Sequence, residues 1–193
     1  MRMAVLGGAA IWFAGLAQAD VLAVPDAQAQ LFDATAAEVE IAPEAGLSDQ
    51  DQGLLRIAAS GQKYYAVVAL PPSEGLMSPA GAIAANYHDL ATAETAALAE
   101  CNGKRMGGKK CVVAARVRPQ GWEKRDFQLS ADATAGFVKA FRRGSGPRAF
   151  AVSASTGVWG FAKGDDAAAA AIADCAAKPA ASAPRDCKVV VAD

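Results

Sequence analysis

Four cysteines, placed in two similar stretches, constrain the fold of this chain more than any other feature. Residues 98–117 read LAECNGKRMGGKKCVVAARV, and residues 172–193 read IADCAAKPAASAPRDCKVVVAD. Each stretch contains an alanine-rich tract, a cysteine, a short loop, a second cysteine and a valine-rich run. Such recurrence is the sequence signature of an internal structural repeat.

The similarity extends upstream of the cysteines. When Cys101 is aligned with Cys175, the residues before each cysteine align without a gap, and YAVVAL (residues 65–70) matches FAVSAS (residues 150–155). The first copy carries an insertion, roughly Pro71 to Gly81. Aromatic and β-branched runs followed by alanine tracts predict the order strand, turn, strand, helix, cysteine loop, strand in both copies.

The turns and helix starts have local causes. In the second copy, Gly157 of the STG turn is expected to take a positive φ. Asp165 and Asp166 are expected to cap the alanine helix that follows, and Thr92 with Glu94 to do the same in the first copy.

The cysteine pairing follows from the repeat. Four cysteines permit three pairings, and the repeat favours the bonds within each copy, Cys101 with Cys111 and Cys175 with Cys187. A helix end and the next strand can lie at the Cα spacing of about 5.5 Å that a disulfide needs. Each closed loop should stabilise the fold by about 2.7 kcal/mol through the unfolded state.

A zinc site is the alternative use of the cysteines. Structural zinc sites usually space their cysteines by two to four residues, and His88 is the single histidine of the chain. The chain also contains no C-x-x-C motif of the redox-active kind. The sequence therefore predicts disulfides, with no metal and no cofactor.

The N-terminus predicts export. Arg2 precedes an uncharged apolar run from Ala4 to Leu16, and small residues flank Gln18, so a signal peptide is expected to be cleaved after Ala19. The run is too short for a membrane anchor, which needs roughly 20 residues. We expect a periplasmic or secreted protein without a stable membrane span, in a compartment where disulfides persist.

The remaining segments predict one compact body. The formal net charge of −1 argues against nucleic-acid binding, but residues 20–60 hold eight acidic residues against Arg56 alone. This acidic arm is expected to form a helix at residues 26–36, a strand in EVEIA and a helix capped by Ser48, and to pack on the body. The residues of the last helix expected to point inward are Leu54, Leu55 and Ile57.

Between the copies, RDFQL (residues 125–129) is expected to be a short strand, and Ser130 with Asp132 to begin a helix. Phe137, Val138 and Phe141 are expected to share one face of that helix, which Arg142, Arg143 and Gly144 close. The predicted class is α+β, with two related units forming a mixed or antiparallel sheet, helices packed on it and disulfides as staples. The predicted organisation is a signal peptide (1–19), an acidic arm (20–62), a first repeat (63–117), a connecting segment (118–147) and a second repeat (148–193).

His88 with Asp89 is the one candidate catalytic pair. A histidine beside a carboxylate can act as a general base, yet no nucleophile motif such as G-x-S-x-G accompanies it. The second copy has Ala162 at the aligned place. A surface or helix-capping histidine is the plainer interpretation.

Two loops are candidate binding sites. The first cysteine loop carries four basic residues among glycines, without the order of a nucleotide-binding loop. The insertion has an apolar tip, and long decorated loops often carry function. The candidate binding residues are Lys104, Arg105, Lys109, Lys110, Leu76 and Met77, and the expected partner is an envelope protein or a small anionic ligand.

Residues 149–193 resemble a family of secreted bacterial proteins that is known only as a domain of unknown function. The resemblance is carried by FAVSASTGVWGFAKG, an alanine helix that ends in a cysteine, and CKVVVAD; residues 64–117 resemble it more loosely and lack the TG turn. The resemblance implies export and a small disulfide-bonded α+β unit, and it supplies no catalytic residue.

Chains of this overall kind also resemble proteins labelled as aminolevulinate synthases. That activity is not expected, because the pyridoxal-phosphate fold needs roughly twice this length and a Schiff-base lysine in a recognisable setting. A non-catalytic binding protein of the periplasm or the exterior is the leading hypothesis, and a hydrolase that uses His88 with Asp89 is the alternative.

Overall fold

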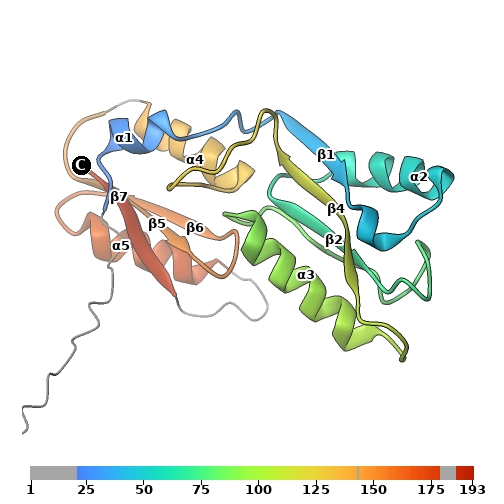
Figure 1. Ribbon diagram of the computed structural model, residues 1–193. Coiled ribbons are helices and arrows are strands. Elements are labelled where there is room, and N and C mark those ends of the chain that lie inside the picture. Colours follow the sequence, from blue (N-terminus) through green and yellow to red (C-terminus); the bar gives the residue numbers. More distant parts are fainter. Residues whose placement is uncertain (1–20, 143, 179–185) are drawn as a thin grey trace, which may run out of the picture.

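The computed structural model describes residues 21–142, 144–178 and 186–193, so the predicted signal peptide lies outside the described residues. It contains two antiparallel sheets with helices packed on them, which confirms the predicted α+β class (Figure 1). The elements in chain order are α1 (Val24–Ala29), β1 (Ala37–Ile41), the 3-10 helix η1 (Pro43–Ala45), α2 (Asp49–Ser60), β2 (Ala66–Leu70), β3 (Ala82–Ala84), α3 (Leu90–Lys104), β4 (Val112–Pro119), α4 (Ala131–Phe141), β5 (Arg148–Ser153), β6 (Trp159–Lys163), α5 (Ala167–Ala177) and β7 (Cys187–Ala192).

The first sheet has the strand order β1-β4-β2-β3, and each neighbouring pair is antiparallel. Its two faces are covered by different helices. On one face α3 packs along β2 and β3, whereas on the other face α2 packs on β1 and β4 (Figure 1). The helix α2 is therefore offset from the β2–β3 half of its face.

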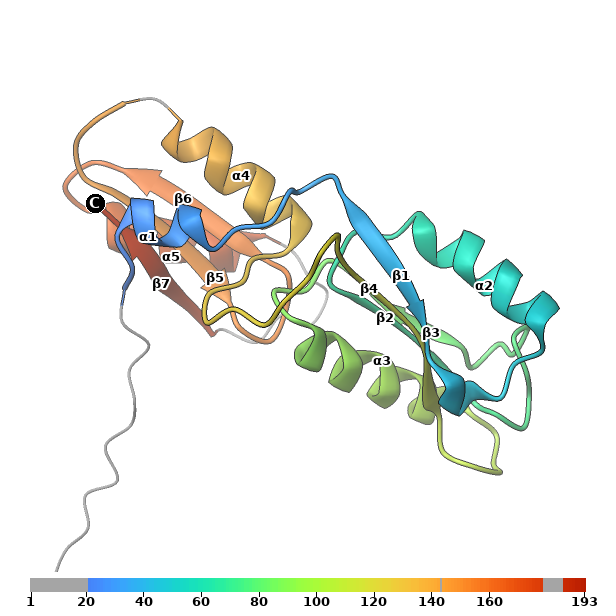
Figure 2. The same ribbon diagram turned by 45° about the horizontal axis from the view of Figure 1, so that its top comes forward.

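The second sheet has the strand order β6-β5-β7. The helix α5 covers one face, and α4 lies over the other, with α1 beside it (Figure 2). The outer edge of β7 pairs with the beginning of the described chain, because the Leu22 amide donates to Val190 O at 2.9 Å and the Ala192 amide donates to Leu22 O at 3.1 Å. We call the first sheet with α2 and α3 the first body, and the second sheet with α1, α4 and α5 the second body. The acidic arm thus contributes α1 to the second body and β1 to the first.

Small residues set how closely α3 and α5 approach their sheets. Each helix buries two alanines and a cysteine at successive spacings of four residues, which places them on one face. On the facing strand β6, a Cβ built on Gly160 would lie 2.3 Å from Ala171 O, so only a glycine fits there. The alanine tracts of the sequence are therefore close-packing surfaces as well as good helix formers. The two buried sets are Ala93, Ala97 and Cys101, and Ala167, Ala171 and Cys175.

Both predicted disulfides are confirmed. Cys101 is bonded to Cys111 and Cys175 to Cys187, each with a Cα–Cα distance of 6.1 Å. Each bond joins the last part of a helix to the beginning of the strand that follows the cysteine loop. The loop of the second pair lies largely outside the described residues.

The two bodies share an element order. After the arm strand β1 is set aside, the first strand of each repeat (β2 or β5) lies between its second strand (β3 or β6) and its last strand (β4 or β7), and a helix precedes the last strand. Each unit builds its own sheet rather than a share of one common sheet. The internal repeat in the stricter sense of two superposable units stays a prediction.

The acidic arm departs from its prediction in two ways. Its first helix ends at Ala29 instead of reaching residue 36. In α2, which Ser48 caps as predicted through a hydrogen bond from the Asp51 amide, Leu55 is buried but Leu54 and Ile57 are exposed. At 3.6 residues per turn, Leu54 and Ile57 lie about 60° apart on the side away from Leu55, so the three cannot share one inward face.

The connecting segment also differs from its prediction. RDFQL is not a strand, because its backbone bonds to the arm instead of a sheet edge: the Phe127 amide donates to Gln30 Oε1 at 2.9 Å. Ser130 caps the start of α4 as predicted, because the Ser130 hydroxyl accepts a hydrogen bond from the Ala133 amide. Val138, however, is exposed, since it follows the buried Phe137 by one position. The predicted closing residue Arg143 lies outside the described residues.

Two local predictions about turns and caps were wrong. Asp89, not Thr92 with Glu94, caps α3. Asp166 is the N-cap residue of α5 as predicted, although its side chain makes no cap hydrogen bond. Gly157 does not take a positive φ. It is needed for space, because a Cβ at this position would lie 1.6 Å from Asn86 O.

Candidate functional site

His88 joins the two bodies of the molecule. The side chain is 6% exposed, and its Nδ1 accepts a hydrogen bond from the Ser130 amide at 3.1 Å. Nε2 lies 3.1 Å from Val158 O, and because Nδ1 is the acceptor, Nε2 carries the proton and donates it. Burial lowers the pKa of His88, against the smaller opposite effects of the Val158 hydrogen bond and nearby carboxylates. Both ring nitrogens of a neutral imidazole are thus used by backbone groups.

Asp89 is likewise used by the fold. Its Oδ1 accepts from the Thr92 amide at 2.7 Å and its Oδ2 from the Thr92 hydroxyl at 2.8 Å. Of the two residues considered for hydrolase chemistry, His88 is therefore a buried side chain that bonds to backbone groups of other segments, and Asp89 is the cap of α3. The arrangement offers neither a free ring nitrogen nor a carboxylate that orients the ring.

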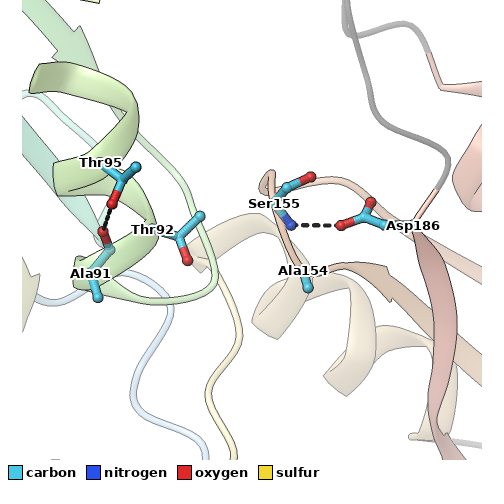
Figure 3. Close-up of a pocket in the computed structure, with 6 residues that line it drawn as sticks. All are labelled: Ala91, Thr92, Thr95, Ala154, Ser155 and Asp186. Atoms are coloured by element: carbon cyan, nitrogen blue, oxygen red, sulfur yellow. Dashed lines mark hydrogen bonds between the residues drawn. The ribbon is translucent and has the colours of Figure 1, made fainter. Parts of the chain in front are cut away.

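A shallow hollow of about 400 Å³ lies between the two bodies, close to His88 and Asp89 (Figure 3). Thr92 and Thr95 of α3 line one side, and Ser155 and Asp186 line the other. Burial works to raise the pKa of Asp186, but hydrogen bonds from Ser153 and Ser155 outweigh it and leave the pKa below its ordinary value. Asp186 thus anchors the turn after β5, and its side chain is committed to that role.

The four candidate residues of the basic loop divide into two pairs. Arg105 folds back onto the loop, donating to Asn102 Oδ1 and to Gly108 O, and Lys104 pairs with Glu100 one turn earlier in α3. The other two, Lys109 and Lys110, are exposed and have no ion pair within the part of the chain that the structure describes.

The basic loop and the insertion lie against each other. A Cβ built on Gly108 would lie 2.8 Å from Ser73 Oγ, so the loop backbone packs directly on the insertion. In the insertion, Leu76 is partly buried against the core and Met77 is 89% exposed. The two loops that the sequence suggested as a partner site are therefore adjacent.

An apolar groove of about 410 Å³ runs between the insertion and α2. Its floor is the β2–β3 half of the sheet face from which α2 is offset, and Val68 and Ile83 stand there as cross-strand neighbours. Leu54, Met77 and Ile83 line the groove and remain exposed. The lining residues are Leu54, Leu55, Ala58, Val68, Leu70, Leu76, Met77, Ser78, Gly81, Ala82 and Ile83.

The sequence indicates the insertion side of this groove but not the α2 side. Leu54 and Ile57 were expected to point inward together with Leu55. A helical projection would have found the signal, since Leu54 lies about 100° and Ile57 about 160° around the helix from Leu55. Ile83 carried no such signal, because a three-residue strand is too short for alternation to show which face is exposed.

Within residues 21–142, 144–178 and 186–193, no cluster of histidine, cysteine or acidic residues could hold a metal ion. No helix in the same ranges is long and apolar enough to cross a membrane. Comparisons of the chain with protein-family models, with curated proteins and with solved structures find no match.

Proposed function

We propose that this protein is an exported, non-catalytic binding protein that takes an apolar segment of a partner protein into the groove between α2 and the insertion. The observation that carries the proposal is the groove itself, an apolar hollow of about 410 Å³ rimmed by exposed hydrophobic side chains. Exposed apolar surface of this kind, bordered by polar residues, is typical of protein interaction sites.

The construction of the groove favours a protein segment as the occupant. Its floor is formed by β2 and β3, and β3 is an edge strand of the sheet. Met77 lines the groove and is exposed, and its side chain is unbranched and adaptable, like those that line peptide-binding surfaces. Ile57 extends the apolar side of α2 beyond Leu54, so a segment longer than the groove gains further contact.

The charge beside the groove suggests the composition of the partner. Lys109 and Lys110 belong to the loop that packs on the insertion at Ser73, and neither is neutralised by a carboxylate of the described residues. An apolar segment flanked by acidic residues would satisfy both the groove and these lysines. Such charge complementarity mainly raises the association rate and the specificity.

Export is the part of the proposal that rests on the cysteines and the predicted signal peptide. Two disulfides, each within its own unit, are compatible with an oxidising compartment outside the cytoplasm. The resemblance to secreted bacterial domains of unknown function implies the same destination. We do not extend the proposal to hydrolase chemistry, because both nitrogens of His88 are bonded to backbone groups.

The test is capture from envelope extracts with the mature chain, residues 20–193, followed by a comparison of variants. Met77→Asp and Ile83→Asp place a charge in the groove, and because both side chains are exposed, the urea midpoint should be unchanged. We expect both variants to lose the partner that the wild type retains, and Lys109→Glu with Lys110→Glu to weaken its retention.

Lys188→Gln is the matched control, because Lys188 is an exposed residue of β7 on the other body. It should retain the partner. Retention of the same proteins by both groove variants, or their loss with the control, would rule out the groove as the binding site.

A further inference from the structure

A second hollow, of about 420 Å³, lies on the other body between α4 and β6. Alternation along β6 points Trp159, Phe161 and Lys163 toward α4, whereas Gly160 faces α5. Aromatic rings thus form the floor of this hollow, and the backbone of α4 forms its wall. The lining residues are Gly136, Lys139, Ala140, Trp159, Phe161 and Lys163.

The aromatic floor is held rigidly. The Trp159 ring stacks on Phe150 with centroids 5.1 Å apart, and Lys178 Nζ lies 4.0 Å from the Trp159 ring centroid. A Cβ on Gly136 would lie 2.4 Å from the indole, so the ring fits against bare helix backbone. Phe141 packs edge-on against Phe161 at 5.4 Å. A ligand would therefore meet a preformed surface, made of Phe161 and the part of the indole that Phe150, Lys178 and Gly136 leave uncovered, and would order little on binding.

Two lysines flank this floor without carboxylate partners. Neither Lys139 nor Lys163 takes part in an ion pair among the described residues, and both are exposed. Lys139 projects from α4, and Lys163 Nζ would lie 3.8 Å from a Cβ on Gly144, beyond the end of the same helix. The two ammonium groups therefore come from α4 and from β6 and border the same hollow. In contrast, Lys178 is already paired with Asp174.

We propose that this hollow binds a small organic anion with a flat aromatic body, such as an aryl sulfonate or an aryl carboxylate. The aromatic part would contact Trp159 and Phe161, and the anionic group would lie between Lys139 and Lys163. The volume is within the range of small-molecule sites, which combine mostly apolar walls with a few placed polar groups. This site is separate from the groove of the first body and does not depend on it.

The experiment follows the indole N–H signal of Trp159 in the NMR spectrum of the mature chain during titration with naphthalene-2-sulfonate. Trp122 is the other tryptophan of the described residues, so a Trp122→Phe variant assigns the signal. We expect a saturable shift, and about five-fold weaker binding in Lys139→Gln and in Lys163→Gln, as expected for the loss of one partly exposed charge contact. Lys188→Gln is the matched control and should bind as the wild type does.

Two further probes separate the parts of the proposal. Methanesulfonate carries the charge without the ring, and 2-naphthol carries the ring without the charge at pH 7; neither should match naphthalene-2-sulfonate. The proposal is overturned by the absence of a saturable Trp159 shift or by equal binding of either probe. Unchanged affinity in both lysine variants would overturn it as well.

Discussion

The ring of His88 and the carbonyl oxygen of Val158 belong to different bodies of the molecule and are joined by a hydrogen bond of 3.1 Å. The same ring accepts from the Ser130 amide at the start of α4. The imidazole, which lies just before α3, is therefore hydrogen-bonded both to the start of α4 and to the turn before β6. Its protonation state becomes part of the stability of the junction between the two bodies.

The first prediction concerns pH. Burial holds the pKa of His88 below its ordinary value of 6.5, so the unfolded chain binds this proton more readily than the folded one. The stabilisation by neutral His88 should be complete above pH 6.5 and should decline as the pH falls through 6.5 toward the folded pKa, by at most about 1.4 kcal/mol per pH unit. Urea unfolding at pH 7.5, 6.5 and 5.5 measures this slope.

The control for the pH prediction is His88→Gln, since His88 is the single histidine of the chain. This variant should be less stable at pH 7.5, by about 1–3 kcal/mol for the disturbed backbone partners. Its unfolding free energy should change less between pH 7.5 and 5.5 than that of the wild type. An equal slope in the two proteins would show that His88 is not the titrating group.

The second prediction concerns two glycines. Gly157→Ala should destabilise the fold by at least about 3 kcal/mol, because its Cβ would collide with Asn86 O across the junction. Gly53→Ala is the matched control: no atom lies within 4 Å of a Cβ there, and an alanine inside α2 should stabilise by about 0.5–1 kcal/mol. Opposite signs in thermal or urea unfolding are expected, and a neutral Gly157→Ala would contradict the close contact.

The third prediction concerns the disulfides. Intact-mass measurement after alkylation without reduction should find no reactive thiol in the mature chain, since all four cysteines are bonded. Replacing either pair by serine should lower the unfolding free energy by about 2–4 kcal/mol. Peptide mapping that finds a bond between the two units would refute the pairing.

The fourth prediction concerns the two sides of α2. Leu55→Ala should cost about 2–5 kcal/mol, because this side chain is buried in the first body. Ile57→Ser, at a position that is 73% exposed, should change the unfolding free energy by less than about 0.5 kcal/mol. A large loss of stability in Ile57→Ser would mean that this side of α2 is covered in solution.

Local chemistry made part of the fold predictable. The helix that Ser48 caps, the helix that begins at Ser130 and the pairing of each cysteine with its neighbour were all predicted and confirmed, because each depends on residues close in sequence. The candidate site was half predictable. The insertion and the basic loop were identified, but the offset of α2 that opens the groove depends on how two distant segments pack.

The errors share a cause. RDFQL has strand composition, but its Phe127 amide donates to the side chain of Gln30 in the arm, some ninety residues earlier in the chain. Gly157 was assigned a role in its own turn, whereas its real constraint is the carbonyl of Asn86 on the other body. His88 was expected on the surface for the same reason. Contacts between segments that are distant in the chain leave no periodic pattern in the sequence, so local reasoning does not find them.

The pairing of Leu22 with β7 has a consequence for the order in which the molecule can assemble. Residues 37–119 contain all the strands of the first sheet and can pair as soon as that part of the chain has been synthesised. The edge at Leu22 must wait for Val190 and Ala192, near the other end of the sequence. A translation product that stopped before Cys187 would lack β7 and would also leave Leu22 without its backbone partners.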